Sequence, residues 1–217
     1  KIIIHSENGK SEVMNLFKVD QDKIHVIPHG DYKFFVPDNL ITIGEAKTSL
    51  NIDPNMKTIL FFGAIRGNKG LENILSAMPL IRKHIPNVKL LIVGEPLENY
   101  NLYRGIIERN NLEDIIWEKL DYIPNEEVPR YFFASDIVVL PYYEITGSGI
   151  LQIAYAFSKP VVASDIEGFR ETVEDGKNGY LVKLGDYNAM AAGISEILLN
   201  DEMRERMGEY SRFMADT

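Results

Sequence analysis

Short runs of apolar, mostly β-branched residues recur along the chain and alternate with longer amphipathic stretches. Continuous apolar runs are typical of strands that are covered on both faces of a sheet, whereas amphipathic periodicity predicts helices. Strands are therefore expected at residues 24–27, 58–63, 88–94, 115–117, 136–141, 160–163 and 179–182. Helices are expected between them, at residues 71–84, 100–109, 126–134, 150–157 and 189–199.

This alternation of strand and helix predicts an α/β fold with a doubly wound, Rossmann-like parallel sheet. Ligands of such sheets bind at the carboxyl ends of the strands, so the loops that follow the strands are the places to search for chemistry. A turn at residues 27–30, which contains Pro28 and Gly30, redirects the chain near its start. We expect a compact domain over 24–200, the tail of a preceding domain over 1–23, and a charged surface helix within 201–217.

Composition narrows the choice of partners. The formal net charge of −9 makes the surface repel nucleic-acid phosphates, so no nucleic-acid partner is expected. The sequence has no cysteine, and its four histidines show no metal-ligand spacing, so no metal is expected either. No apolar run approaches the roughly 18 residues that a membrane span needs. These features favour a cytoplasmic location.

The loop between the strand at 58–63 and the helix at 71–84 is the first candidate site. Glycines let backbone N–H groups approach a ligand, and the N-terminus of the following helix favours negative charge. Arg66 and Lys69 place two cations where they oppose the helix dipole, which a bound diphosphate would explain. A Walker P-loop is excluded, because Asn68 stands where that motif requires glycine. The alternative is a solvated turn with two surface cations.

A second glycine-containing loop follows a later strand. Backbone N–H groups of Gly147, Ser148 and Gly149 would face an anion at the start of the next helix. Glu144 leads into this loop and can accept hydrogen bonds from hydroxyls, and Gln152 lies one turn into the helix. A ligand that carries hydroxyls beside its phosphates would contain a ribose or another sugar. A helix cap with a surface glutamate is the alternative explanation.

Two further segments give weaker signals. Gly94 and Glu95 lie at the end of a strand. Many parallel strands end in glycine, so this position alone is a weak signal. Asp165 and Glu167 precede a short polar stretch and are interpreted as helix-capping residues. No Gly-x-Gly-x-x-Gly follows any strand, so a dehydrogenase is disfavoured.

Taken in order, the motifs resemble the C-terminal domain of glycosyltransferase family 4, the group 1 glycosyltransferases of GT-B fold. Gly63, Arg66, Lys69 and Gly70 are similar to the family's phosphate-binding segment. The other matching segments are residues 24–30, 134–141, 160–165 and 171–182. The resemblance implies a retaining, hexosyltransferase-type enzyme that uses a nucleotide sugar, with UDP or GDP as the nucleotide. It implies no metal and no further cofactor.

The resemblance also implies roles for individual residues. Arg66 and Lys69 would neutralise the donor diphosphate and its developing charge, and Glu144 would meet the donor sugar. Gln152 departs from the family, since most members have glutamate there against the ribose hydroxyls. The expected donor-binding residues are Gly63, Gly94, Glu95, Ile123, Thr146, Gly147, Ser148, Gly149 and Gln152. One diphosphate can be shared only if the two glycine loops lie side by side.

In this family the acceptor binds an N-terminal domain. Residues 1–23 are then the tail of that missing domain, and residues 201–217 are the start of a truncated helical extension. The acceptor would be a glycan or a lipid-linked glycan of polysaccharide biosynthesis, with peripheral membrane association through the missing half. The isolated chain is expected to bind nucleotide weakly without turnover. The alternatives are a non-catalytic sugar-nucleotide-binding domain and a GT-B-type epimerase, although no acid/base set suited to an epimerase is evident.

Overall fold

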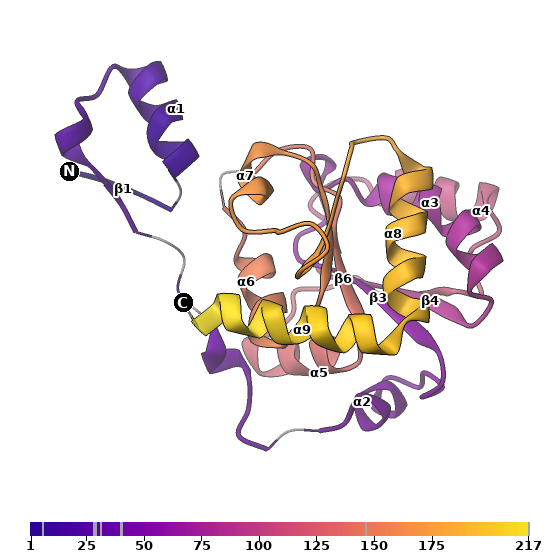
Figure 1. Cartoon of the computed structure of the whole chain (residues 1–217). Helices are drawn as coiled ribbons and strands as arrows, with labels where there is room; N and C mark the ends of the chain where they lie inside the picture. Colours follow the sequence, from indigo (N-terminus) through magenta and orange to yellow (C-terminus); the bar gives the residue numbers. More distant parts are fainter. Residues whose placement is uncertain (6, 28–29, 31, 40, 146, 217) are drawn as a thin grey trace.

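The computed structural model describes residues 1–5, 7–27, 30, 32–39, 41–145 and 147–216. Six parallel strands form its main sheet in the order β5-β4-β3-β6-β7-β8 (Figure 1). The strands are β3 (Lys57–Phe62), β4 (Val88–Val93), β5 (Ile116–Lys119), β6 (Ile137–Leu140), β7 (Val161–Ser164) and β8 (Gly179–Val182). The strand order reverses between β3 and β6, so the crevice for a ligand is expected at the carboxyl ends of these two strands. The predicted parallel α/β fold is confirmed.

Helices cover both faces of the sheet because successive side chains of each buried strand point to opposite sides. The helices that follow or flank the strands are α2 (Ile43–Ser49), α3 (Leu71–His84), α4 (Asn101–Arg109), α5 (Val128–Phe133), α6 (Gly149–Ala156), α7 (Glu167–Arg170), α8 (Tyr187–Leu199) and α9 (Asp201–Asp216). Ile59 and Phe61 of β3 join the core beneath α3, α4 and α8, whereas Leu60 and Phe62 join the core beneath α2, α5 and α6.

The first strands form a separate two-stranded sheet. β1 (Ile2–Ile4) pairs in parallel with β2 (Ile24–Val26), and α1 (Glu7–Phe17) makes the crossover between them (Figure 1). The sequence predicted the strand at 24–27, but it grouped these residues with the large domain. In the structure β2 instead pairs with β1, and α1 supplies the long crossover connection that two parallel strands require. The division of the chain into domains otherwise stays a prediction.

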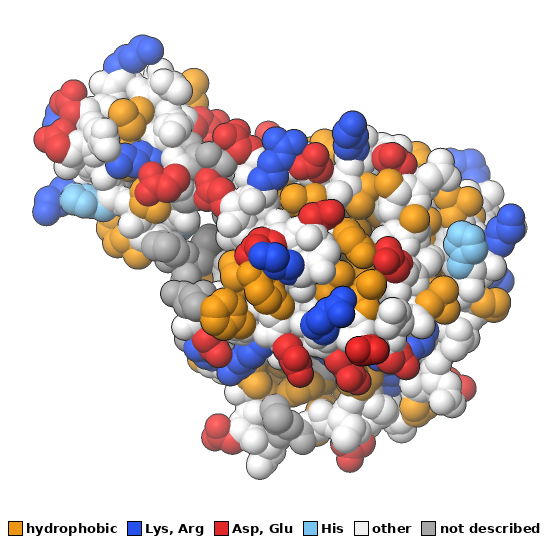
Figure 2. Space-filling view, in the orientation of Figure 1, with side chains coloured by type: hydrophobic (Ala, Val, Ile, Leu, Met, Phe, Trp, Pro, Cys, Tyr) orange, Lys and Arg blue, Asp and Glu red, His pale blue; other side chains and the backbone are white. Residues whose placement is uncertain are grey.

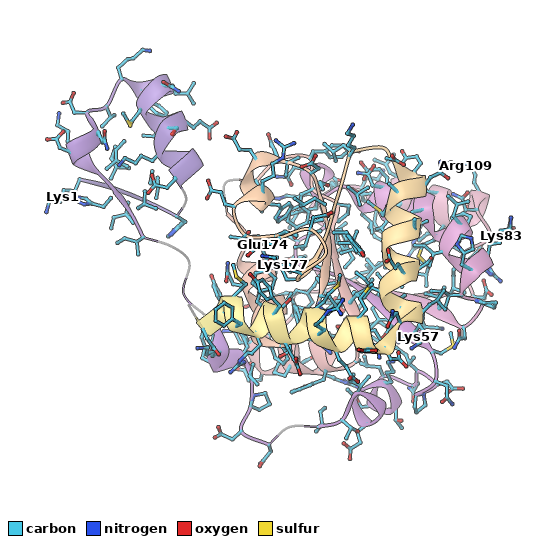
Figure 3. The ribbon with its side chains drawn as sticks, in the orientation of Figure 1. Lys1, Lys57, Lys83, Arg109, Glu174 and Lys177 are labelled. Carbon is cyan, nitrogen blue, oxygen red and sulfur yellow. The ribbon has the colours of Figure 1, made fainter. Side chains whose placement is uncertain are left out.

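Helix α9 is charged, as expected, but one of its faces is buried. Met207, Gly208, Ser211 and Ala215 are buried, and the helix packs against α6. Tyr210 donates a hydrogen bond of 2.7 Å to Glu174, which also pairs with Lys177 (Figure 3). The helix is thus part of the main body.

The surface shows how charge is distributed. Acidic and basic side chains are interspersed over the face in Figure 2. Attraction for an anion must then come from cations close to its site, because exposed charges are screened within roughly 8 Å at physiological salt. None of the helices within the described ranges has the length and apolar content needed to cross a membrane.

Candidate functional site

The loops after β3 and β6 meet at the point where the strand order reverses. Gly70, at φ +62°, ends the short helical turn η3 (Gly67–Lys69), and a Cβ there would lie 2.0 Å from the carbonyl oxygen of Pro141. Only glycine permits this approach of the two backbones. The Tyr143 N–H also donates to the Asn68 carbonyl oxygen at 3.0 Å. The two loops therefore lie side by side, as a shared ligand requires.

A cavity of about 850 Å³ opens beside these loops. Four of the residues expected in the site line it, namely Arg66, Lys69, Glu144 and Gly147. Asn68, Ile145, Glu167 and Gly168 complete this side, and the opposite wall comes from α1 with Gly9, Ser11, Glu12, Asn15 and Leu16. Two cations and several hydrogen-bonding groups thus face one open cavity large enough for a small molecule.

Lys69 is held in an unusual environment for an ammonium group. Its Nζ lies 3.7 Å from the centroid of the Tyr142 ring, within the range of a cation–π contact. Burial, followed by the nearby positive charge of Arg66, lowers the pKa of Lys69 to about 8. Burial also raises the pKa of Tyr142, which keeps its phenol neutral beneath the ammonium. An anion between the two cations would offset both the desolvation and the repulsion of Lys69.

The second loop contributes in a different way. Ser148 is buried, and its hydroxyl accepts a hydrogen bond of 3.1 Å from the Leu151 N–H, so this side chain caps α6. The capping alternative therefore holds for the side chain of Ser148, while Gly147 reaches the cavity. A Cβ on Gly149 would lie 3.2 Å from the Tyr32 hydroxyl oxygen, which places the segment after β2 against the start of α6. Thr146 lies outside the described residues.

The remaining expected residues do not line the cavity. These are Gly63, Gly94, Glu95, Ile123, Ser148, Gly149 and Gln152, and their donor-binding roles stay predictions. Gly94 has a clear structural reason: at φ +143° its Cα faces the Gly63 carbonyl oxygen, which would lie 2.0 Å from a Cβ. Ile123 belongs to the apolar core beneath α5.

Glu167 is a cavity residue that the sequence reasoning interpreted as a cap. The N-cap of α7 is Ile166, and the Asp165 carboxylate accepts a hydrogen bond of 2.6 Å from Arg170 instead, so the capping interpretation is wrong. A Cβ on Gly168 would lie 2.5 Å from the Ile145 carbonyl oxygen. This close contact brings the loop after β7 against the loop after β6 and places Glu167 in the cavity with Glu144.

Among the described residues, no three His, Asp or Glu side chains gather in a group that could hold a metal ion. Positive charge in the cavity is instead supplied by Arg66 and Lys69.

Comparisons with known proteins identify the family and the fold. Residues 43–214 match the family described as glycosyl transferases group 1. The D-inositol 3-phosphate glycosyltransferase of Corynebacterium glutamicum is 27% identical over 214 residues, which cover 96% of this chain and 51% of the relative. The chain therefore spans about half the length of this curated relative.

Two solved structures share the fold. The C-terminal domain of the group 1 protein LpcC from Francisella tularensis superposes with a TM-score of 0.74 at 21% identity, covering 87% of this chain and 96% of that domain. HepE from Anabaena, in complex with UDP and glucose, superposes with a TM-score of 0.87 at 20% identity, covering 99% of this chain and 57% of HepE. The chain belongs to the group 1 glycosyl transferases, and its fold is that of the C-terminal half of a GT-B enzyme.

Proposed function

We propose that this chain is the donor-binding half of a retaining glycosyltransferase that moves a sugar from a UDP- or GDP-sugar to a glycan or lipid-linked acceptor. The observation that carries the proposal is the convergence of Arg66, Lys69, Glu144 and Gly147 on one cavity at the carboxyl ends of β3 and β6. A diphosphate matches the two cations in charge, and a sugar matches the adjacent carboxylate in its hydroxyls.

In the proposed reaction, the bond between the anomeric carbon and the diphosphate oxygen breaks, and a bond from that carbon to an acceptor hydroxyl oxygen forms. Negative charge grows on the leaving phosphate, which takes up the proton of the acceptor hydroxyl. Arg66 and Lys69 would stabilise that charge from fixed positions without a metal ion. Backbone N–H groups near Gly147 and Gly149 would bind the phosphate oxygens, and Glu144 would accept hydrogen bonds from the sugar. These residues contact the leaving group and the transferred sugar, so they are the candidates for catalysis.

The relatives support the nucleotide sugar more than they support any acceptor. HepE, which shares the fold, was solved with UDP and glucose, and this supports a similar donor here. The acceptor named for the Corynebacterium relative is not transferred to this chain, because the relative is about twice as long. We infer that a further domain of a longer protein holds the acceptor, in the cytoplasm and with peripheral attachment to a membrane.

Titration calorimetry on the 217-residue chain tests the donor site directly. UDP and GDP are titrated alongside UMP and GMP, which have the same bases but one phosphate fewer. We expect at least one diphosphate to bind about tenfold more tightly than its monophosphate, because the second phosphate completes the contact with both cations. A folded chain that releases no heat with any of these nucleotides would refute the proposal.

A non-catalytic sugar-nucleotide sensor is the second candidate, and Gln152 is the residue that favours it. An amide replaces the carboxylate that most members place against the ribose. Sensor and transferase would both bind the diphosphate, so binding does not separate them. Transfer of radiolabelled sugar by the longer protein distinguishes them, because a sensor would transfer no sugar to an acceptor.

A further inference from the structure

The turn that carries both cations is held by its two neighbouring loops. On the β6 side, the Asn68 carbonyl oxygen accepts the Tyr143 N–H at 3.0 Å. On the β4 side, the Gly67 N–H donates to Oε2 of Glu98 at 2.8 Å. Glu98 lies in the loop between β4 and α4 and does not line the cavity. A side chain outside the cavity thus touches the residue directly after Arg66.

Backbone hydrogen bonds join the loops after β3 and β4, but they end before Gly67. The bond from Gly67 to Glu98 continues this series. Beyond β3, the Ile65 N–H donates to the Glu95 carbonyl oxygen at 2.9 Å, and the Leu97 N–H donates to the Ile65 carbonyl oxygen at 2.9 Å. The next contact between the two loops is made by the Glu98 carboxylate. A side-chain oxygen therefore accepts the Gly67 N–H in the place of a further backbone carbonyl.

The carboxylate is itself fixed from the other side. The Tyr103 hydroxyl donates to Oε1 of Glu98 at 2.5 Å, and Tyr103 is only 4% exposed. Burial first, and the neighbouring carboxylate second, raise the pKa of Tyr103, so the phenol keeps its proton and remains a donor. Each oxygen of Glu98 thus has a defined partner, which restricts the carboxylate to one orientation.

We propose that Glu98 is a positioning residue for the cationic turn, with Tyr103 orienting its carboxylate. The inference rests on the proposed binding of a diphosphate by Arg66 and Lys69. A negative charge near a diphosphate site weakens binding if charge alone matters, so anchoring and charge predict opposite effects when Glu98 is removed. Holding the Gly67 N–H fixes where the two cations stand before the ligand arrives, and the ligand then does not have to order them.

The chain offers a matched control at the start of the same helix. Tyr100, the N-cap of α4, donates to Oε1 of Glu118 at 2.6 Å, a second tyrosine–carboxylate pair. The Tyr100 ring lies 5.6 Å from the Tyr103 ring, whereas the Gly67 N–H bonds Glu98 and not Glu118. Glu118→Ala therefore removes an equivalent pair without releasing Gly67. Glu98→Gln tests charge separately, because the amide oxygen can still accept the Gly67 N–H after the negative charge is gone.

Calorimetry compares three variants, Glu98→Ala, Glu98→Gln and Glu118→Ala, with the unchanged chain. The ligands are UDP or GDP, whichever binds more tightly, and the matching nucleoside. We expect Glu98→Ala to weaken diphosphate binding about tenfold and to leave nucleoside binding unchanged, while Glu98→Gln stays within about threefold and Glu118→Ala changes neither. Tighter diphosphate binding by both Glu98 variants, or equal losses for diphosphate and nucleoside, would overturn the positioning role.

Amide hydrogen exchange of the ligand-free chain gives a second readout that does not depend on nucleotide binding. Glu98→Ala should accelerate exchange at Gly67, whose N–H bonds the carboxylate, and Glu118→Ala should not. If the unchanged chain binds no diphosphate, the proposed function fails while this measurement still reports on the anchor. Unaltered exchange at Gly67 in Glu98→Ala would show that the carboxylate does not hold the turn.

Discussion

The two loops that meet at the candidate site are built on different principles. The turn after β3 presents its chemistry on the side chains of Arg66 and Lys69 and is held by neighbouring loops on both flanks. The loop after β6 presents the Glu144 carboxylate together with backbone groups, and the Ser148 side chain bonds its own helix. Positive charge is therefore concentrated in one loop, whereas the other supplies a carboxylate and dipoles. Loss of side chains should consequently weaken diphosphate binding strongly at Arg66 and Lys69 and little at Ser148.

Removing both cations should have the largest effect on binding. In the double variant Arg66→Ala and Lys69→Ala, we expect nucleoside diphosphate affinity to fall at least about a hundredfold, because two charge-assisted contacts are lost. Arg66 is exposed and Lys69 is half-buried, so the fold should survive. Calorimetry measures the affinity, and circular dichroism checks the fold.

The matched control removes the same charge elsewhere. Lys83 and Arg109 are exposed at the ends of α3 and α4, away from the cavity (Figure 3). The double variant Lys83→Ala and Arg109→Ala should bind diphosphate almost unchanged. Equal losses in the two double variants would mean that net charge, rather than the turn, attracts the ligand.

Alkaline pH should weaken binding through Lys69. The pKa of free Lys69 is lowered to about 8, and a bound diphosphate would raise it, so the complex takes up a proton in this range. Affinity should be close to its maximum at pH 7, already be reduced at pH 8, and be about threefold to tenfold lower at pH 9. Lys69→Arg keeps its charge throughout and should show a flat profile. A decline of equal size in Lys69→Arg would assign the titration to another group.

Much of this fold was readable from local sequence. The helix at 71–84 was predicted with the bounds that the structure has, because its apolar periodicity begins directly after Gly70. Arg66, Lys69 and Glu144 were found because they follow apolar strands in glycine-containing loops, and parallel strands bring such loops to one edge. The cavity between these loops depends on Gly70 and Gly168, whose close backbone contacts only the folded chain reveals.

Non-local contacts account for what the sequence did not predict. The run at 24–27 predicted a strand, which the structure has at Ile24–Val26, but its partner is β1 rather than the main sheet. Sequence reasoning did not single out Glu98 and interpreted Glu167 as a cap. Only the adjacency of β4 to β3 and of β7 to β6 gives these two residues neighbours near the site. The sequence feature that could have identified them is their position after a parallel strand, because no distinctive residue stands beside them.

Gln152 offers the smallest and most discriminating change on the glycine-loop side. It lies half-buried in the first turns of α6, where its N–H bonds the Ser148 carbonyl oxygen. In Gln152→Glu, two carboxylate oxygens can accept from both ribose hydroxyls, but repulsion from the diphosphate offsets much of the gain. We therefore expect about threefold tighter binding of the ribonucleotide, measured by calorimetry.

The 2′,3′-dideoxynucleotide is the control for this change. It should gain nothing, because it lacks both hydroxyls. An equal gain with the dideoxynucleotide would place Gln152 away from the ribose. A gain confined to the ribonucleotide would show that the helix after the glycine loop orients the donor that the cationic turn attracts.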